Sequence, residues 1–363
     1  MNPLFLATPP GLESVCAEEA PALGLKSVRA VPGGVEGEGD LAAVLRANLA
    51  SRIASRVVLR LGEGATSEAA AIARAIDWRA FVPEGGNIEL EIAGGGRDPS
   101  RFERAIRGAI QGAVPYAAVA TGGAAVQSIR VRIAGGRIHV GVDSSGAHLH
   151  QRGYRQETGA APLRENLAAG ILRLAGYDGS QPLLDPMCGS GTFVIEAALM
   201  ALGRGPGMGR SFACESWPSM PAGLPASVRA SLREAERERP AGAVLGSDRN
   251  AGALGVARRN ATRAGVFSAI TLVRRDVADL EAPAPGPGVV VVNPPYGRRV
   301  GEAGELAGLY RTLGERLRSE FAGWTCAVLV ADRSLGARLR LPSPVETHLR
   351  NGGIPCVLLV SSL

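Results

Sequence analysis

The chain has 363 residues, of which 46% are hydrophobic, 20% are charged and only 4% are aromatic. This length allows two or three compact domains, each with a core built mainly from aliphatic side chains. No apolar run approaches the roughly 20 residues that cross a bilayer, and the N-terminal segment lacks the positively charged start of a secretory signal. We therefore expect a cytoplasmic protein that does not associate with membranes.

The five cysteines are scattered, and no two have the spacing of a zinc site. Neither a disulfide framework nor a bound metal is expected. The net charge is +6, and Arg supplies every positive side chain except Lys26. A GC-rich genome would explain this preference, but the planar guanidinium also suits phosphate, so the composition is compatible with an RNA partner.

The first third of the chain predicts a mixture of short strands and helices. Expected strands are residues 4–7, 56–61 and 88–92, and expected helices are residues 11–23, 41–54, 65–75 and a segment that begins near Asp98 and Ser100. In the last helix, Phe102, Ile106 and Ile110 lie on one face.

Residues 128–143 predict a β-hairpin. With residues 135–136, a Gly-Gly pair, as the turn, every apolar residue of one strand opposes an apolar residue of the other. The same register places Arg130, Arg132 and His139 together on the opposite face. That face could be an ordinary solvated surface or a surface that contacts RNA.

From about residue 162, helices alternate with short buried strands, which predicts a parallel sheet. Expected strands are residues 182–184, 243–246, 270–273, 289–292, 327–330 and 356–360, and expected helices are residues 163–174, 192–202, 251–264 and 305–320. Residues 203–242 are rich in Gly, Pro and Arg and predict a surface insertion with one charged helix, residues 227–239.

The first segment that suggests chemistry is DPMCGSGT, residues 185–192. Asp185 ends a strand, and Gly189, Ser190 and Gly191 form a tight turn into a helix that begins at Thr192. Small residues let the backbone approach a ligand, and the helix N-terminus offers free N–H groups to a carboxylate. These residues alone are also compatible with a dinucleotide-binding fold, whereas a P-loop would need a Lys that is absent.

Two further carboxylates follow strands of the expected sheet. Asp248, in GSDRN, is placed to bind ribose hydroxyls, or alternatively to cap the helix that follows it. Asp276, in RRDVA, could accept a hydrogen bond from an adenine amino group, or belong to a surface turn. Neither position decides between these interpretations by itself.

The sharpest signal is VVVVNPPYG, residues 289–297. Four valines form a buried strand, which two consecutive prolines then end and redirect. The Asn293 side chain and the Pro294 carbonyl can both accept hydrogen bonds from an NH₂ group, and Tyr296 can stack on a flat base. Such a segment indicates a site that holds the amino group of a base.

Together, DPMCGSGT and NPPYG resemble the class I amino-methyltransferases, and nearly the whole chain resembles the THUMP-domain RNA methyltransferases. The similarity is greatest to the bacterial 23S rRNA guanine-N2-methyltransferase family, historically described as adenine-specific DNA methylases. It extends through FLATPPGLESV, PGGVEGEGD, SRIASRVVLRLGE and HLHQRGYRQETGAAPLRENLAA. Some bacterial members carry a second methyltransferase at the C-terminus, whereas this chain contains one.

The resemblance implies an α/β architecture: a Rossmann-like methyltransferase domain with a mostly parallel seven-stranded sheet, preceded by α+β ferredoxin-like and THUMP domains. The expected boundaries are residues 1–60 for the ferredoxin-like segment, 61–155 for the THUMP domain and 156–363 for the methyltransferase domain, with 203–242 as its insertion.

The resemblance also implies S-adenosylmethionine as cofactor and assigns the site residues. The expected cofactor-binding residues are Pro162, Arg164, Asn166, Asp185, Pro186, Cys188, Gly189, Ser190, Gly191, Thr192, Asp248, Arg249, Asp276, Val277 and Asn293. The expected catalytic residues are Asn293, Pro294, Pro295 and Tyr296, and the expected RNA-binding residues are Arg130, Arg132, Arg152, Tyr154 and Arg155.

The expected activity is methyl transfer to the exocyclic N2 amino group of a guanine, in 23S rRNA. Four alternatives stay open: a tRNA guanine-N2-methyltransferase, an adenine-N6 DNA methyltransferase, an enzyme that methylates a protein Gln, and a non-catalytic RNA-binding protein with a vestigial methyltransferase fold. The NPPY motif alone does not separate guanine from adenine. We expect RNA as partner, and a monomer or weak dimer.

Overall fold

The computed structural model describes residues 1–94, 99–115, 118–119, 126–156, 163–284, 286–296 and 303–363. It divides into two compact units. The N-terminal unit comprises residues 1–8, 16–149 and 210–231, and the C-terminal unit comprises residues 9–15, 150–209 and 232–363. Among the described residues, no helix has both the length and the apolar character needed to cross a membrane.

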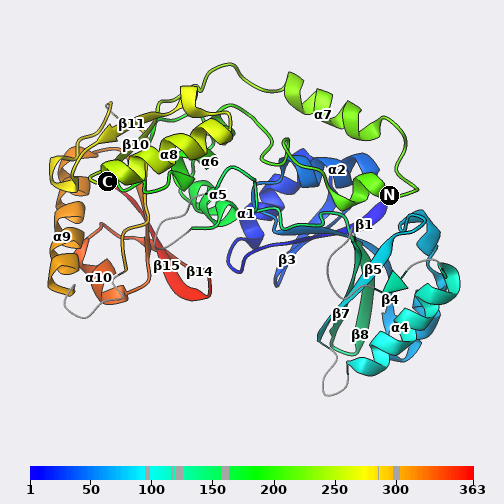
Figure 1. The fold of residues 1–363 in the computed structure, drawn as a ribbon. Helices are drawn as coiled ribbons and strands as arrows, with labels where there is room; N and C mark the ends of the chain where they lie inside the picture. Colours follow the sequence, from blue (N-terminus) through cyan, green and yellow to red (C-terminus); the bar gives the residue numbers. More distant parts are fainter. Residues whose placement is uncertain (95–98, 116–117, 120–125, 157–162, 285, 297–302) are drawn as a thin grey trace. The chain divides into compact units, whose positions relative to one another are not determined.

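The N-terminal unit is built on one eight-stranded sheet, with strand order β2-β3-β1-β4-β8-β7-β5-β6 (Figure 1). Its strands are β1 (Asn2–Ala7), β2 (Lys26–Val31), β3 (Gly34–Gly39), β4 (Arg56–Ala65), β5 (Asn87–Gly94), β6 (Ala118–Val119), β7 (Val126–Ala134) and β8 (Arg137–Asp143). It also contains helices α2 (Leu41–Ala50), α3 (Ala69–Ala75) and α4 (Ser100–Ala113), whereas α1 (Glu13–Glu19) is divided between the two units after Val15.

The first four strands, with α1 and α2 between them in the sequence, have the strand order of a ferredoxin-like βαββαβ unit. This confirms the predicted ferredoxin-like N-terminus. The expected boundary at residue 60 lies inside β4, which pairs with β1 on one side and with β8 on the other. Residues 1–60 and the strands that follow therefore share one continuous sheet.

The predicted hairpin is confirmed in its turn and in its register. Gly135 and Gly136 have φ values of 55° and 74°, the left-handed conformation that a two-residue hairpin turn requires. Val131 pairs with Val140, and Arg132 pairs with His139. The apolar residues are buried on the face where α3 packs, so the arginines lie on the other face.

Part of the expected surface insertion belongs to the N-terminal unit. Trp217 is buried, its indole Nε1 donates a hydrogen bond to Gln127 Oε1 at 2.6 Å, and its ring meets Phe81 edge-to-face at 5.2 Å. Residues 210–231 are thus anchored by a core tryptophan. The charged helix of the insertion is α7 (Leu224–Glu234), shorter than the expected 227–239 and shifted toward the N-terminus.

The C-terminal unit contains the predicted seven-stranded, mostly parallel sheet, in the order β11-β10-β9-β12-β13-β15-β14. Its strands are β9 (Leu183–Asp185), β10 (Val244–Asp248), β11 (Thr271–Arg274), β12 (Val289–Val292), β13 (Thr325–Val330), β14 (Val345–Asn351) and β15 (Ile354–Ser362). The first five are parallel, and the β14–β15 hairpin is antiparallel.

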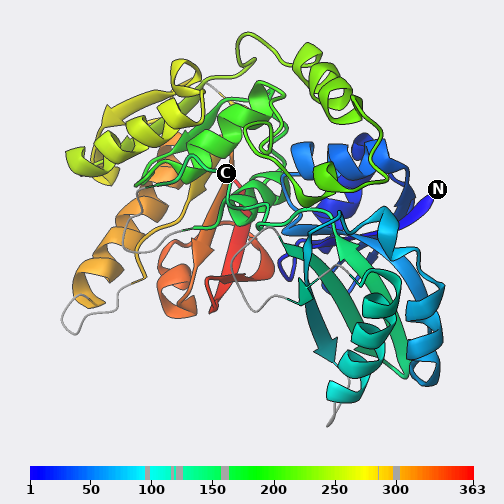
Figure 2. The ribbon, with the colours of Figure 1, turned by 45° about the vertical axis from the view of Figure 1, so that its right-hand side comes forward.

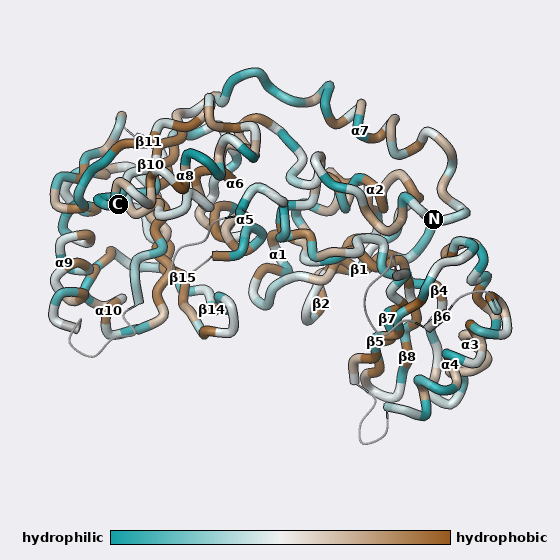
Figure 3. Tube along the Cα trace, in the orientation of Figure 1, coloured by the Kyte–Doolittle hydropathy of each residue, from teal (hydrophilic) through white to brown (hydrophobic). Residues whose placement is uncertain are grey.

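Helices cover both faces of this sheet (Figures 1 and 2). They are α5 (Glu165–Leu174), α6 (Thr192–Ala201), α8 (Ala251–Arg263), α9 (Ala303–Glu320) and α10 (Arg333–Arg338). Val290 and Val292 pack in one cluster with Tyr310 of α9 and with Phe321, the residue after α9. All four valines of β12 are buried. Burial on both faces explains why this strand is a continuous apolar run, and Figure 3 shows the same hydrophobic colouring along β15.

Candidate functional site

The predicted site residues lie at the carboxyl ends of three adjacent strands. β9 is flanked by β10 on one side and by β12 on the other, so the order of the strands along the chain reverses at β9. Ligands of open α/β sheets bind outside the carboxyl ends of the strands at such a switch point. The turn after β9, Asp248 at the end of β10 and Asn293 after β12 all lie on this edge.

The turn after β9 is tied to its neighbours by its own backbone. Gly189 N–H donates to Asp248 Oδ2 at 3.0 Å, and Cys188 N–H donates to the Ser247 carbonyl at 2.9 Å. From α8, Asn260 Nδ2 donates to the Ser190 carbonyl at 3.0 Å. The turn therefore has a fixed conformation relative to β10 and α8.

The two glycines of this turn have different surroundings. Both have positive φ, 53° at Gly189 and 88° at Gly191. A Cβ at Gly191 would lie 3.0 Å from the Ala257 Cβ, whereas a Cβ at Gly189 would meet nothing within 4 Å. Gly191 thus lets α6 and α8 pack closely, and Gly189 borders open space, as a backbone that contacts a ligand should.

Asp185 is buried beneath this turn. Its Oδ1 accepts a hydrogen bond from Met187 N–H at 3.1 Å. Burial, opposed by the Met187 hydrogen bond and supported by the nearby charge of Asp248, raises the pKa of Asp185 from its ordinary value of 3.8 to about 8. Without a cationic or hydroxyl partner, Asp185 is therefore protonated at neutral pH.

Asp248 is half-buried, and its carboxylate accepts hydrogen bonds from Gly189 N–H and Asn250 N–H. The residue that caps α8 is Asn250, whose Oδ1 accepts from Gly252 N–H at 2.9 Å. The interpretation of Asp248 as the helix cap is therefore wrong. Each carboxylate oxygen accepts more than one hydrogen bond, so Asp248 still fits the hydroxyls of a ribose.

Asp276 follows β11 and is exposed. Its Oδ1 accepts from Ala278 N–H at 3.0 Å, so it caps the short 3₁₀ turn of residues 277–279. A cavity of about 350 Å³ lies beside these strand ends, and its lining includes Ser247 and Arg275, the residues directly before the two acidic positions. Ligand binding by Asp276 stays a prediction.

The remaining predicted cofactor residues differ in exposure. Asn166 is buried in α5, Arg164 is exposed just before that helix, and Pro162 lies outside the described residues. Pro186, Cys188, Thr192 and Val277 are buried, Ser190 is half-buried and Arg249 is exposed. Among the described residues, no group of His, Cys, Asp or Glu side chains is arranged to hold a metal ion.

The NPPY segment continues β12 beside this turn. Val290 pairs with Leu184 of β9, so Asn293 follows three residues further along the neighbouring strand. The Tyr296 hydroxyl donates a hydrogen bond to Asn293 Oδ1. From α9, the hydroxyl of the buried Tyr310 donates to the Pro295 carbonyl at 3.3 Å. Two tyrosines thus fix the conformation of this segment, one from within it and one from beneath it.

The β14–β15 hairpin borders Tyr296. Burial raises the pKa of Tyr296, as does the nearby Cys356, while a hydrogen bond to the Asn351 side chain lowers it. The net rise keeps the hydroxyl protonated at neutral pH, so it can donate to Asn293. Pro294 is buried, whereas Pro295 is exposed.

Three of the five predicted RNA-binding residues have partners inside the C-terminal unit. Tyr154 is buried, and its hydroxyl donates to Glu196 Oε1 at 3.0 Å. Arg152 has a side chain only 2% exposed, with its Nε 3.6 Å from Glu196, and Arg155 pairs with Glu165 at 3.1 Å. Burial argues against RNA contact by Arg152 and Tyr154, because neither head group reaches the surface.

Three supporting residues carry no motif in the sequence: Asn260, Tyr310 and Glu196. Glu196 is fully buried in α6, in an otherwise apolar helix, TFVIEAALMA. Asn260 is likewise buried on the inner face of α8. A polar residue within an apolar stripe is a signal of a buried hydrogen-bond partner, but the sequence does not say which group it serves.

Comparisons with known proteins agree with this geometry. The family described as "RMKL-like, methyltransferase domain" matches residues 152–359, and the RlmL ferredoxin-like domain matches residues 3–58. Two curated relatives, from Chromohalobacter salexigens and Pseudomonas aeruginosa, are each 36% identical over 98% of this chain. Both are named "Ribosomal RNA large subunit methyltransferase K/L", and the chain spans only 52% of their length.

Two solved structures share the fold over 99% of this chain. SMU.472, described as "a putative methyltransferase complexed with SAH", is 26% identical, with a TM-score of 0.85 over 98% of its length. A Listeria monocytogenes protein described as "a predicted N6-adenine-specific DNA methylase" is 28% identical, with a TM-score of 0.88 over 96% of its length. The family model matches residues 152–359, which is more than half of this chain. The chain therefore belongs to the RMKL-like methyltransferase family.

Proposed function

We propose that this protein methylates the exocyclic N2 amino group of a guanine in 23S rRNA. The observation that carries the proposal is the position of Asn293. Its side chain follows the end of β12, the strand that pairs with β9. The turn after β9 has the features of a cofactor site. The names of the curated relatives supply the RNA class.

S-adenosylmethionine is the methyl donor, and its sulfonium makes the methyl group electrophilic when it is bound. Gly189 offers open space beside a positive-φ turn, and Asp248 offers carboxylate oxygens to ribose hydroxyls. The buried carboxyl of Asp185, which accepts a hydrogen bond from Met187 N–H, would stabilise the turn from beneath.

Asn293 and the Pro294 carbonyl would accept the two N–H bonds of the target amine. Such contacts fix the direction of its lone pair, and correct placement supplies a large part of the rate in reactions of this type. The Asn293 oxygen has two acceptor positions. One receives the Tyr296 hydroxyl, which orients the amide, and the other remains available to the amine. The Tyr296 ring would stack on the base once it has left its helix.

The RNA would be held by the N-terminal unit, through Arg132 on the face of the sheet opposite the helices. Arg130 lies on the same face, where its pairs with Glu91 and Asp143 would shape the RNA-binding surface. An rRNA substrate fits a cytoplasmic enzyme, and we propose that it acts as a monomer or weak dimer. THUMP-type RNA capture by residues 61–155 stays part of this proposal.

The test is a comparison of modified nucleosides. Purified protein, labelled S-adenosylmethionine and 23S rRNA from a strain that lacks the gene should yield N2-methylguanosine after nuclease digestion. The same assay with tRNA tests the tRNA alternative. No methylation of either RNA, with normal cofactor binding, would contradict the proposal.

The Listeria neighbour favours one second candidate, because it is described as an adenine-specific DNA methylase and shares the fold over 99% of this chain. Both substrates would present an NH₂ group to Asn293. Incubation with unmethylated DNA separates the two proposals. N6-methyladenine in the DNA digest would support this candidate, and N2-methylguanosine confined to RNA would eliminate it.

A further inference from the structure

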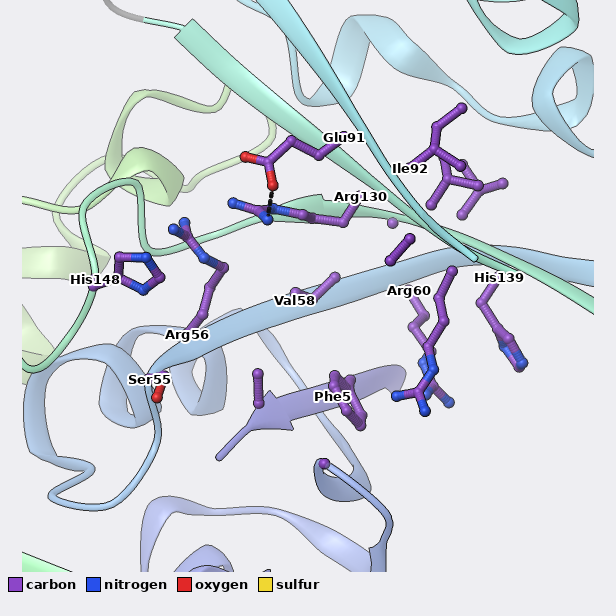
Figure 4. Close-up of a pocket in the computed structure, with 17 residues that line it drawn as sticks. Phe5, Ser55, Arg56, Val58, Arg60, Glu91, Ile92, Arg130, His139 and His148 are labelled. Atoms are coloured by element: carbon purple, nitrogen blue, oxygen red, sulfur yellow. Dashed lines mark hydrogen bonds and ion pairs between the residues drawn. The ribbon is translucent and has the colours of Figure 1, made fainter. Parts of the chain in front are cut away.

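The open face of the N-terminal sheet carries a cavity of about 430 Å³, formed by residues of the N-terminal unit alone (Figure 4). This volume lies within the range of small-molecule and cofactor sites, about 300–1,000 Å³. The cavity lies over β1, β4, β8, β7 and β5, on the side away from α2, α3 and α4. Its floor includes the apolar side chains of Phe5, Val58 and Ile92.

Four arginines and one carboxylate line this cavity. Two of the arginines lie close to one buried carboxylate. Arg56 pairs with Asp143, which is fully buried, and Arg130 Nη2 lies 3.7 Å from the same carboxylate. Arg130 also pairs with Glu91, as Figure 4 shows. Burial and the nearby charge of Arg130 lower the pKa of Arg56 to about 10, so both remain cations at neutral pH.

The other two arginines have their guanidinium groups near the ring of Phe5. The guanidinium carbons of Arg60 and Arg132 lie 5.0 Å and 5.8 Å from the ring centroid. Arg60 pairs with Glu36 at 2.7 Å. Arg132 is exposed, and it forms no ion pair with a carboxylate in the part of the chain that the structure describes. Its Nη2 donates a hydrogen bond to the uncharged Pro32 carbonyl at 3.5 Å, so the positive charge of Arg132 is available to an anion.

His139 lies opposite Arg132 in the hairpin. Burial and the charge of Arg60 lower its pKa from the ordinary 6.5, although Glu63 at 3.1 Å opposes that shift. It is therefore neutral at neutral pH and adds a flat ring without a charge. An aromatic ring beside two guanidinium groups, one of them exposed and without a carboxylate partner among the described residues, suits a base and its phosphate, since bases stack on aromatic and arginine planes alike.

We infer that this cavity holds one unpaired nucleotide of the RNA substrate, with its base on the Phe5 side and its phosphate on Arg132. The inference rests on the proposed function, since it assumes that the substrate is RNA. A cavity of this size admits a single nucleotide. The bases of double-stranded RNA could not enter it, because a duplex presents only its backbone and its shallow minor groove to a protein surface. The Asp143 pairs with Arg56 and Arg130 keep the walls in place and are not expected to exchange for phosphate.

The experiment measures RNA binding by the full chain. The probe is a fluorescein-labelled RNA of about 12 nucleotides without self-complementarity, a length within the site sizes of single-strand binders, and the same RNA as a duplex. The variants are Arg132→Gln and Phe5→Leu. The matched control is Arg137→Gln, an exposed arginine of the same hairpin that lies outside the cavity lining and pairs with Glu63.

Arg132→Gln should weaken binding of the unpaired RNA about tenfold and reduce the slope of log affinity against log salt by about 0.7, the loss of one phosphate contact. Phe5→Leu should weaken it by about 5- to 100-fold, because stacking on the ring is lost. The Arg137→Gln control should stay within about twofold of wild type. All proteins should bind S-adenosylmethionine equally, which shows that they are folded.

Two results would overturn the inference. One is unchanged affinity in both cavity variants while the wild type binds and methylates RNA. The other is a wild-type preference for the duplex. If the wild type neither binds nor methylates any RNA, the proposed function itself fails, and that outcome is distinct from both.

Discussion

Replacement of Asn293 by Ala tests the centre of the proposed chemistry. The Asn293 oxygen accepts the Tyr296 hydroxyl in the structure and has a second acceptor position for the target amine. The variant loses both contacts. Removal of one positioned hydrogen-bond partner from an active site costs about 3 kcal/mol, or about a hundredfold in kcat. Cofactor affinity should change little, because the Asp248 and Gly189 contacts are untouched.

A double-mutant cycle shows whether Tyr296 acts through Asn293. Tyr296→Phe keeps the ring and removes the hydroxyl, and with it the orienting hydrogen bond to Asn293, worth about 1 kcal/mol or about fivefold in kcat. If the hydroxyl acts only by orienting the amide, Tyr296→Phe should have no further effect in the Asn293→Ala background. The assay is single-turnover methyl transfer, with calorimetry of cofactor binding as the folding control. Full single-turnover activity of Asn293→Ala would refute the amine-positioning mechanism.

The elements predicted correctly are those whose local pattern and burial agree. The four valines of β12 are bounded by Gly288 and Asn293, and the strand has the predicted limits, residues 289–292. The hairpin register follows from one Gly-Gly turn and alternating apolar residues. In both cases the signal is local, because strand faces and turn geometry are encoded by neighbouring residues.

The strand β3 was missed because packing overrides its composition. Its sequence, GVEGEG, has three glycines and two glutamates, which favour a loop. A Cβ at Gly34 would lie 2.3 Å from the Leu6 carbonyl oxygen and 2.6 Å from the Phe5 ring. Glycine is thus required by the close approach of β1, a contact that the local sequence does not reveal.

The motif residues of the site could be predicted from the sequence, but their supports could not. Asp185, Gly189 and Asn293 belong to short segments with a recognisable order of small, acidic and proline residues. Tyr310 contacts the NPPY segment from 15 positions along the chain, and Asn260 reaches the glycine turn from 70 positions along it. No periodicity connects such positions, because they meet only when the helices pack against the sheet.

Three further predictions concern the cofactor edge and the NPPY segment. Asp248→Ala should weaken S-adenosylmethionine binding about 5- to 150-fold in calorimetry, because a buried hydrogen-bond donor that loses its acceptor costs about 1–3 kcal/mol. An unchanged affinity would show that Asp248 stabilises only the turn. Tyr310→Phe should lower kcat about fivefold without change in cofactor affinity, because it removes one hydrogen bond to the Pro295 carbonyl. The last prediction concerns the pH dependence of stability, which follows from the pKa of Asp185, raised to about 8 from its ordinary 3.8. In that interval the folded protein keeps a proton that the unfolded chain releases, so this residue makes the free energy of unfolding fall as the pH rises. Asp185→Asn cannot ionise and keeps an oxygen for the Met187 N–H, so it should lose this part of the slope while every other titrating group stays the same. Urea unfolding of both proteins at pH 5 and pH 8, without cofactor, measures the difference, and parallel slopes would mean that Asp185 is ionised in the folded protein.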